Sequence, residues 1–326
     1  MTKLMIYGAT GYTGRLVAEQ AKAAGLDFEI AGRDAGKLVA ASSELGVAHR
    51  VFPLDDPARV AKHLASISVL LNCAGPFART AEPLMRACMA VGAHYLDITA
   101  EINVYRLAET LGDAATTSGT MLLPGVGWDV VPTDCLAAHV MRRVETPQRL
   151  RIALQVAGSM SRGSAVSAGE IIGAGLMARV NGSLVSKADA AFAAFDFGDG
   201  PVDCAPLSFG DLVTAWRSTA IPNIEMFVHF SGTFPEGDLA RLPDGPSAEE
   251  RSAHRARAIA EVIGADGRVA RSVIETVNGY SYTPLAAVEA TRRVLAGEHR
   301  AGFQTPVTVF GADFAESIAD TTITDF

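Results

Sequence analysis

The sequence predicts an α/β fold: a doubly wound parallel (Rossmann) sheet with a second α+β domain built on an open mixed sheet. Two observations predict it. Short apolar segments alternate with runs of helix-forming residues through residues 4–123, which is the pattern of successive βαβ units. From about residue 149 onwards the apolar segments are richer in β-branched residues and helices are fewer, which is typical of a mixed sheet.

A glycine-rich turn stands at the first boundary between a strand and a helix. An apolar segment precedes residues 8–14, which read Gly-Ala-Thr-Gly-Tyr-Thr-Gly, and good helix formers follow. Such a turn binds a dinucleotide pyrophosphate, because the helix N-terminus offers unpaired N–H groups and partial positive charge. We expect Gly8 to allow the tight turn, Gly11 to admit the pyrophosphate and Gly14 to let the helix pack on the strand. The expected cofactor-binding residues here are Gly8, Thr10, Gly11, Tyr12, Thr13 and Gly14.

The glycine spacing differs from the G-x-G-x-x-G pattern, so a turn that binds nothing is the alternative. The end of the second expected strand, residues 28–31, then indicates which cofactor is preferred. An NAD site places a carboxylate there for the ribose 2′-hydroxyl, but here small neutral residues are followed by Arg33 and then by Lys37. Two cations suit a 2′-phosphate, so we predict NADP(H). The alternative is that both cations are solvated and that Asp34 merely caps the next helix.

Four more strands complete the expected parallel sheet, at residues 47–54, 69–74, 95–98 and 120–123, with helices at 82–91 and 105–118 between them. Doubly wound folds bind ligands at the carboxyl ends of their strands. The remaining expected cofactor contacts therefore follow the third and fourth strands: Asp55, Ala74, Gly75, Pro76 and Phe77.

We divide the chain into an NADP-binding domain of residues 1–123, a bridging turn and helix at 124–148, and a substrate and oligomerisation domain at 149–326. In the last domain, strands are expected at 150–156, 225–230, 268–277 and 306–310, helices at 252–263 and 285–295, and a loop at 235–246. We expect the late helix, residues 284–296, to pack back on the first domain. The open sheet leaves an edge or a face to cover, which predicts a homodimer.

Composition excludes several classes of protein. The chain has 326 residues, of which 49% are hydrophobic and 20% charged, enough for a sizeable core. A net charge of −8 argues against nucleic-acid binding, and no apolar run reaches the roughly 18 residues of a membrane span. The N-terminus shows no basic-then-apolar signal pattern, so we expect a cytoplasmic protein. The four cysteines lack metal-site spacing, so we expect reduced thiols and no bound metal.

These motifs together resemble the NADP-binding domain of the saccharopine dehydrogenase-like family. The segments that carry the resemblance are the glycine turn and residues 31–38, 72–77, 82–88, 95–101 and 124–134. The last segment, Pro-Gly-Val-Gly-Trp-Asp-Val-Val-Pro-Thr-Asp, is similar to the Pro-Gly-x-Gly-Phe-Asp-x-x-Pro-x-Asp motif of a branch that includes the trans-acting enoyl reductases. Saccharopine-forming reductases carry Asp where this chain has Leu123, which counts against saccharopine as the substrate.

The resemblance implies an NADP(H)-dependent oxidoreductase that transfers hydride to or from a C=C, C=O or C=N bond of a small organic substrate. The cofactor carries most of this chemistry, so few protein groups are needed. No Tyr-x-x-x-Lys pair is present to mark a short-chain dehydrogenase. The alternatives are an NADP-sensing regulatory protein without turnover and a scaffold with a vestigial nucleotide site.

Candidate proton donors are expected near the carboxyl edge of the sheet or beside a glycine turn: Asp129, Glu101 and Tyr280. For Asp129 and Asp134, capping of the helix that begins near Pro132 is the competing interpretation. Ser161 and Arg162 lie in a polar stretch, residues 159–164, which would hold an anionic or carbonyl group of the substrate; a loop without a ligand is the alternative. We expect the active site between the domains, with the turns after the fourth and sixth strands facing Arg162.

Overall fold

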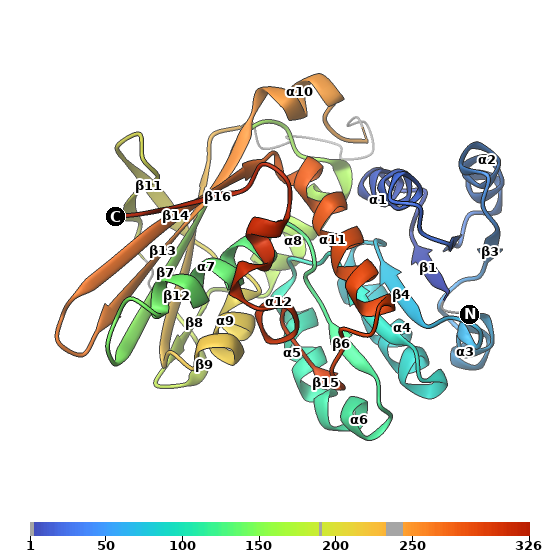
Figure 1. The fold of residues 1–326 in the computed structure, drawn as a ribbon, viewed down its shortest axis with the longest axis horizontal. Helices are drawn as coiled ribbons and strands as arrows, with labels where there is room; N and C mark the ends of the chain where they lie inside the picture. Colours follow the sequence, from blue (N-terminus) through green and yellow to red (C-terminus); the bar gives the residue numbers. More distant parts are fainter. Residues whose placement is uncertain (1–2, 189–190, 233–243) are drawn as a thin grey trace. The chain divides into compact units, whose positions relative to one another are not determined.

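The computed structural model describes residues 3–188, 191–232 and 244–326. The chain forms two compact units (Figure 1). Unit 1 comprises Met1–Thr99, Asn103–Gly127 and Thr283–Gln304, and unit 2 comprises Ala100–Ile102, Trp128–Tyr282 and Thr305–Phe326. The domain limits expected from the sequence, at residues 123 and 149, stay a prediction.

Unit 1 is built on a parallel sheet, sheet A, with the order β15-β6-β5-β4-β1-β2-β3. Its strands are β1 (Leu4–Tyr7), β2 (Phe28–Gly32), β3 (His49–Val51), β4 (Val69–Asn72), β5 (His94–Asp97), β6 (Met121–Leu123) and β15 (Gly302–Phe303). Its helices are α1 (Tyr12–Ala23), α2 (Ala35–Leu45), α3 (Pro57–Leu64), α4 (Phe77–Val91), most of α5 (Ile102–Thr110), α6 (Gly112–Thr117) and most of α11 (Gly279–Leu295). The predicted doubly wound sheet is confirmed, and β15 extends it beside β6.

Local sequence signals explain where these helices begin and end. The Asp56 carboxylate accepts from the N–H groups of Ala58 and Arg59 at the start of α3, where Pro57 is the first residue. Gly46 and Gly92 end α2 and α4 in the left-handed conformation, which costs a glycine little. These signals act within a few residues, so the sequence shows them directly.

Unit 2 is built on a mixed sheet, sheet B, in which β12 and β7 run parallel and the other paired strands antiparallel. Its strands are β7 (Pro147–Val156), β8 (Met177–Val180), β9 (Ser183–Ser186), β10 (Ala193–Asp196), β11 (Pro201–Pro206), β12 (Asn223–Phe230), β13 (Arg255–Gly264), β14 (Val269–Val277) and β16 (Thr322–Asp325). Its helices are α7 (Val131–Met141), α8 (Arg162–Gly173), α9 (Asp211–Thr219), α10 (Ala248–Ala253), α12 (Pro306–Phe310) and the 3₁₀ helix η2 (Ala312–Ser317). The predicted second α+β domain on a mixed sheet is confirmed.

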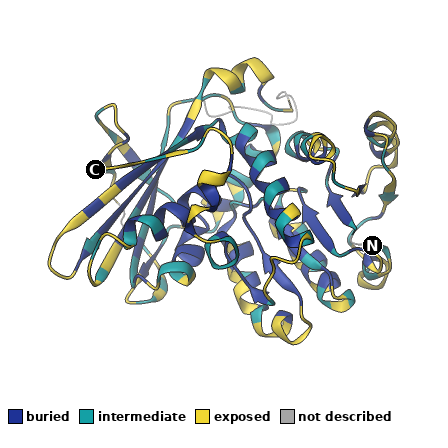
Figure 2. Cartoon of the chain, in the orientation of Figure 1, coloured by how far each residue is buried: buried dark blue, intermediate teal, exposed yellow. Residues whose placement is uncertain are grey.

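The core of unit 2 lies between α7 and the central strands of sheet B. Residues alternate along β7: Leu150, Ile152 and Leu154 are buried, whereas Arg149 lies on the opposite, outer face. The helix α7 contacts β7, β13 and β14 and is buried along most of its length (Figure 2). The outer face is covered in part by an apolar cluster: Ala153, Phe195, Phe197, Cys204, Phe227, Ile259 and Val273.

The helix expected at residues 252–263 is wrong, because β13 begins at Arg255 and only the short α10 precedes it. The Arg-Ala-Arg-Ala start of this strand has a period of two, but alanine and glutamate favour helices locally. Pairing with β7 on one side and β14 on the other overrides that preference.

The strand expected at residues 306–310 is also wrong, because these residues form α12. Thr305 and Thr308 hydrogen bond reciprocally in a capping box, and Pro306 occupies the first helical position. The helix expected at 105–118 is instead two helices, α5 and α6. The loop expected at 235–246 falls mostly on residues 233–243, which lie outside the described residues.

Candidate active site

The glycine turn after β1 has the geometry that its three glycines require. Gly8 adopts φ +87°, and a Cβ atom there would lie 2.7 Å from the Cβ of Ala74 after β4. A Cβ atom at Gly14 would lie 2.2 Å from the Gly8 carbonyl oxygen, so only glycine lets α1 lie this close to β1. At Gly11, by contrast, a Cβ atom would meet only the Gly8 oxygen, at 3.5 Å, and the residue is exposed. The turn is tight at Gly8 and Gly14 and open at Gly11.

The N-terminus of α1 is suited to an anion. Its N-cap is Gly11, which has no side chain to satisfy the first N–H groups, and its first turn contains no acidic residue. The turn follows β1, which lies between β2 and β4 at the point where the strand order reverses. Open α/β sheets bind ligands at this switch point.

The end of β2 carries exposed cations. Arg33 and Lys37 are both exposed, and within the described part of the chain neither forms an ion pair with a carboxylate. Burial raises the pKa of Tyr7 in β1 to about 12, and the Arg33 charge opposes this rise, so the guanidinium lies near the end of β1. Asp34 caps α2 by accepting from the Lys37 N–H at 3.0 Å, as the alternative interpretation expected. The Asp34 carboxylate is therefore engaged with a backbone N–H group, and the side-chain charges of Arg33 and Lys37 can meet an anion.

Buried hydrogen bonds join the carboxyl ends of β4 and β5 to the turn after β6. The Asn72 side chain donates to the Tyr95 hydroxyl at 3.1 Å, and this hydroxyl donates to Asp97 at 2.8 Å. The other Asp97 oxygen accepts from the Gly125 N–H at 2.9 Å, and Asn72 accepts from the Ala74 N–H at 3.0 Å. These bonds hold three neighbouring turns at one edge of sheet A.

This network was not expected, although the sequence carries a signal for part of it: β4 ends on Asn72 and β5 ends on Asp97. The other expected cofactor residues at this edge differ in exposure. Asp55 and Gly75 are exposed, Ala74 and Pro76 are half-buried, and Phe77 is buried as the first residue of α4. Whether they contact a cofactor stays a prediction.

Asp129 lies in the turn before α7 in unit 2. The N-cap of α7 is Val130, and no side chain makes the capping hydrogen bond. The interpretation of Asp129 as a helix cap is therefore wrong. Burial raises the pKa of its carboxyl to about 6, which brings its titration close to neutral pH.

Asp134 does cap a helix, but not the expected one. It lies inside α7, and its Oδ2 atom accepts from the backbone N–H of Val307 at 3.0 Å, in the first turn of α12. Burial raises the pKa of this carboxyl, and its hydrogen bonds oppose the rise. Helix α12 was expected to be a strand, so the sequence offered no helix end for Asp134 to cap.

The polar stretch at residues 159–164 is only partly a loop, because α8 begins at Arg162. Ser161 is the N-cap and accepts from the Ser164 N–H at 3.0 Å. The Tyr280 hydroxyl accepts from the Ser161 N–H at 2.8 Å and donates to the Ser164 hydroxyl at 2.9 Å. Arg162 pairs with Asp244 at 3.1 Å. These polar groups hold the start of α8 in place.

Glu101 is buried and accepts a hydrogen bond from Ser167 of α8 at 2.7 Å. The structure therefore brings Glu101, Ser161 and Tyr280 together around one helix, while Asp129 precedes another. The role of each in catalysis, and the expected position of the active site between the domains, stay predictions.

Comparison with known proteins bears on unit 1 most directly. Residues 4–123 match the family model of the saccharopine dehydrogenase NADP binding domain. The resemblance to the saccharopine dehydrogenase-like family is confirmed. These residues of unit 1 are thus similar to the NADP binding domain of that family.

Two curated relatives match over somewhat more residues than the family model does. A trans-acting enoyl reductase from Mycobacterium ulcerans is 30% identical over 149 residues, which cover 43% of this chain and 36% of that protein. One from Mycobacterium tuberculosis is 30% identical over 148 residues, which cover 43% of this chain and 35% of that protein. The matches thus span about a third of the length of these relatives.

A solved structure matches the whole chain. The saccharopine dehydrogenase (L-Glu forming) from Saccharomyces cerevisiae superposes with a TM-score of 0.69 at 13% identity, covering 100% of both chains. At this identity the match shows the fold alone. It includes the residues of sheet B.

No helix among the described residues is long and apolar enough to cross a membrane. Within residues 3–188, 191–232 and 244–326, no group of three or more His, Cys, Asp or Glu side chains is arranged to hold a metal ion. All four cysteines are buried.

Proposed function

We propose that this protein is an NADP(H)-dependent oxidoreductase that transfers hydride to or from a C=C, C=O or C=N bond of a small organic substrate. One observation carries the proposal. Exposed Arg33 follows a strand end that lacks a carboxylate, beside a glycine turn in a domain that matches an NADP-binding family. The names of the enoyl reductase relatives favour C=C among the three bond types.

Each part of the cofactor would meet a different element of unit 1. Gly11 and the N-terminus of α1 would hold the pyrophosphate, and Arg33 with Lys37 would bind the 2′-phosphate. The turn of residues 74–77 would lie beside the nicotinamide, which supplies or accepts the hydride. The bonds of Asn72 and Asp97 would keep this edge rigid while the cofactor exchanges.

Asp129 is our proposed proton donor. Its pKa of about 6 lets the carboxyl give up and regain a proton near neutral pH, as a general acid must. Glu101 and Tyr280 are the next candidates, but both are engaged with serines of α8. Ser161 and Arg162 remain the proposed contacts for a polar group of the substrate.

The direct test has a binding arm and a turnover arm. Titration calorimetry with NADPH and NADH should show tighter binding of NADPH, because only NADPH carries the 2′-phosphate. A screen of enoyl thioesters, ketones and imines, followed by NADPH absorbance, should then find turnover. Equal affinity for both cofactors would overturn the NADP preference, and tight NADPH binding without turnover across the screen would favour the sensor alternative.

We also propose a symmetric homodimer that covers an edge or a face of sheet B. An open sheet leaves unpaired backbone groups on its outermost strands, and two-fold dimers are the commonest way to cover such surfaces. Light scattering should report about twice the chain mass of 34.1 kDa. A mass of one chain at micromolar concentration would contradict the dimer.

A further inference from the structure

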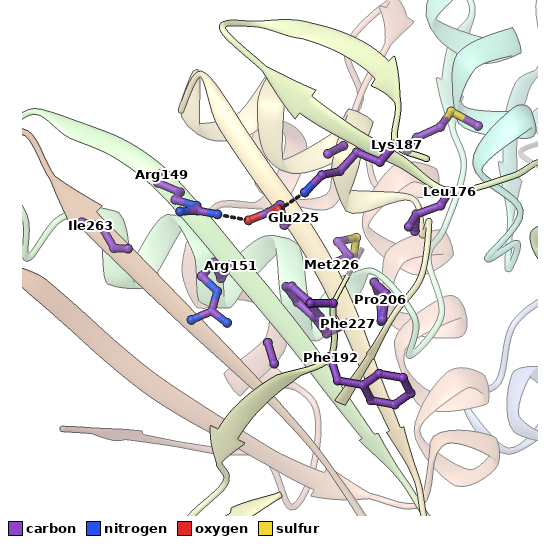
Figure 3. A pocket seen from close by; sticks show the side chains of 14 residues that line it. Arg149, Arg151, Leu176, Lys187, Phe192, Pro206, Glu225, Met226, Phe227 and Ile263 are labelled. Atoms are coloured by element: carbon purple, nitrogen blue, oxygen red, sulfur yellow. Dashed lines mark hydrogen bonds and ion pairs between the residues drawn. The ribbon is translucent and has the colours of Figure 1, made fainter. Parts of the chain in front are cut away.

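The outer face of sheet B, on the side away from α7, is hollowed at β7, β12 and the start of β10. The hollow has a volume of about 420 Å³ and lies wholly within unit 2 (Figure 3). Binding sites for small molecules commonly enclose roughly 300–1,000 Å³. None of the residues expected to bind the cofactor lines it. The nucleotide site therefore does not account for this hollow.

Two cations share one carboxylate in the hollow. Glu225 of β12 accepts from Arg149 of β7 and from Lys187, the latter at 2.5 Å, and Figure 3 shows both side chains directed at it. The side chains of Arg149 and Lys187 are 50% and 35% exposed, whereas that of Glu225 is 17% exposed. Arginine has five N–H donors and the lysine ammonium has three, so most of these donors are not used by Glu225. The hollow has spare donors and an excess of positive charge.

A third cation, Arg151, is fixed in the lining. Its guanidinium lies 4.5 Å from the ring centre of Phe195 and 5.4 Å from that of Phe227, and it pairs with Glu261 at 2.9 Å. Two aromatic rings and one carboxylate thus hold this side chain in one position. Arg151 needs no reordering when a ligand arrives, but Glu261 offsets its charge, so the excess positive charge of the hollow comes from Arg149 and Lys187.

Apolar side chains form the rest of the lining. Leu176 and Pro206 line the hollow and are half-buried, and Phe192 is 69% exposed at the hollow. Figure 3 shows Phe192 directed away from the Arg149–Glu225–Lys187 cluster, so charged and apolar surfaces lie side by side. A ligand that covers both surfaces would need a charged end and an apolar body.

We infer that this hollow binds a small organic anion in which a carboxylate or phosphate group is joined to an apolar body. The anionic group would take the spare donors of Arg149 and Lys187, and the apolar body would cover Leu176 and Phe192. Glu225 competes with the ligand for the same two cations. Removing the Glu225 charge should therefore strengthen binding, whereas removing the cations should weaken it.

The test is titration calorimetry of the whole protein, without nucleotide, with decanoate, decyl phosphate, decanol and inorganic phosphate. Decanoate and decyl phosphate should bind at least about tenfold more tightly than decanol and inorganic phosphate, because only the first pair can contact both the charged and the apolar surface of the hollow. The joint variant Arg149→Gln and Lys187→Gln should lose about tenfold in affinity for both anions, and Glu225→Gln should gain severalfold. Arg86→Gln is the matched control, since Arg86 is an exposed arginine paired with Glu82 in unit 1.

Several results would overturn the inference. Decanol binding as tightly as decanoate would show that the hollow is only apolar, and inorganic phosphate binding as tightly would show that the apolar lining is not used. Equal losses in Arg86→Gln and in the joint variant would place the binding elsewhere. A difference between decanoate and decyl phosphate would instead tell which anionic group the site prefers. Melting temperatures of all variants within a few degrees of the parent would show that the losses are not due to unfolding.

Discussion

Sheet A and sheet B place their polar groups differently. Apart from β3, the strands of sheet A are buried through most of their length, and polar side chains such as Asn72 and Asp97 stand at strand ends, where they hold the neighbouring turns. Sheet B has one face buried against α7, and on its outer face Glu225, Arg151 and Glu261 lie opposite one another across three strands. From this difference we expect ligands to bind at the carboxyl edge of sheet A in unit 1 and on the outer face of sheet B in unit 2.

The largest expected effect tests the edge of sheet A. Gly11→Val should abolish NADPH binding, because its side chain would occupy the open side of the turn where the pyrophosphate is proposed to lie. Because a Cβ atom at Gly11 meets only one atom at 3.5 Å, the fold should survive. Calorimetry with NADPH and thermal unfolding measure the two effects.

Gly14→Ala is the matched control. Its Cβ atom would lie 2.2 Å from the Gly8 oxygen, so this variant should lose stability, by about 1–3 kcal/mol. Unchanged NADPH affinity in Gly11→Val would show that the nucleotide does not bind at this turn.

The second prediction concerns Asp129 in unit 2. Asp129→Asn should lower the rate by about 10²–10⁴-fold, the usual range for a lost general acid, and leave NADPH affinity intact. Single-turnover kinetics with a substrate from the screen measure the rate, and calorimetry measures the NADPH affinity. Near-normal turnover would reject Asp129 as the donor and leave Glu101 and Tyr280 to be tested in the same way.

The third prediction tests cofactor choice at the end of β2. Arg33→Ala should weaken NADPH binding by about 1.5–3 kcal/mol, the size of a charge-assisted contact, and leave NADH binding nearly unchanged. Arg86→Ala removes an exposed arginine from the same unit and should change neither affinity. If both cofactors lose affinity equally in Arg33→Ala, this arginine does not recognise the 2′-phosphate.

The smallest expected effect compares two carboxyls of unit 2 by their pH dependence. For Glu225, burial alone would raise the pKa, but the bonds from Lys187 and Arg149 lower it below its usual value. Its ionised form therefore stabilises the fold above the unfolded-state pKa, and this contribution is lost as the pH falls through the folded-state pKa. Glu225→Gln should cost about 0.5–1.5 kcal/mol at pH 7 and very little near pH 3.

Asp129 should behave in the opposite way, because its pKa is raised. Its folded-state proton is lost as the pH rises through about 6, and stability falls with it. Asp129→Asn should therefore be more stable relative to the parent at pH 7 than at pH 4. Urea unfolding at several pH values measures how the stability of each variant relative to the parent changes with pH. A change of the same sign for Glu225→Gln and Asp129→Asn would contradict this account.

The sequence by itself determined the six strands of sheet A from β1 to β6 and the proposed cofactor, but not β15. Each βαβ unit is encoded over a few tens of neighbouring residues, by an apolar run, a turn glycine and a capping side chain such as Asp34 or Asp56. The roles of Gly8 and Gly14 could also be predicted, because a tight turn and a close helix contact demand glycine for steric reasons that act locally.

Only the tertiary structure decided some elements of unit 2, among them β13 and α12, and the partners of its polar groups. The strand β13 was mistaken for a helix because its residues favour helices until β7 and β14 pair with it. Asp134 was assigned to the wrong helix because α12 is 173 positions away in the chain. The pairing of Arg151 with Glu261 and the hollow around Glu225 likewise join residues of separate strands. Such contacts form only when distant segments pack together, and no pattern among neighbouring residues records them.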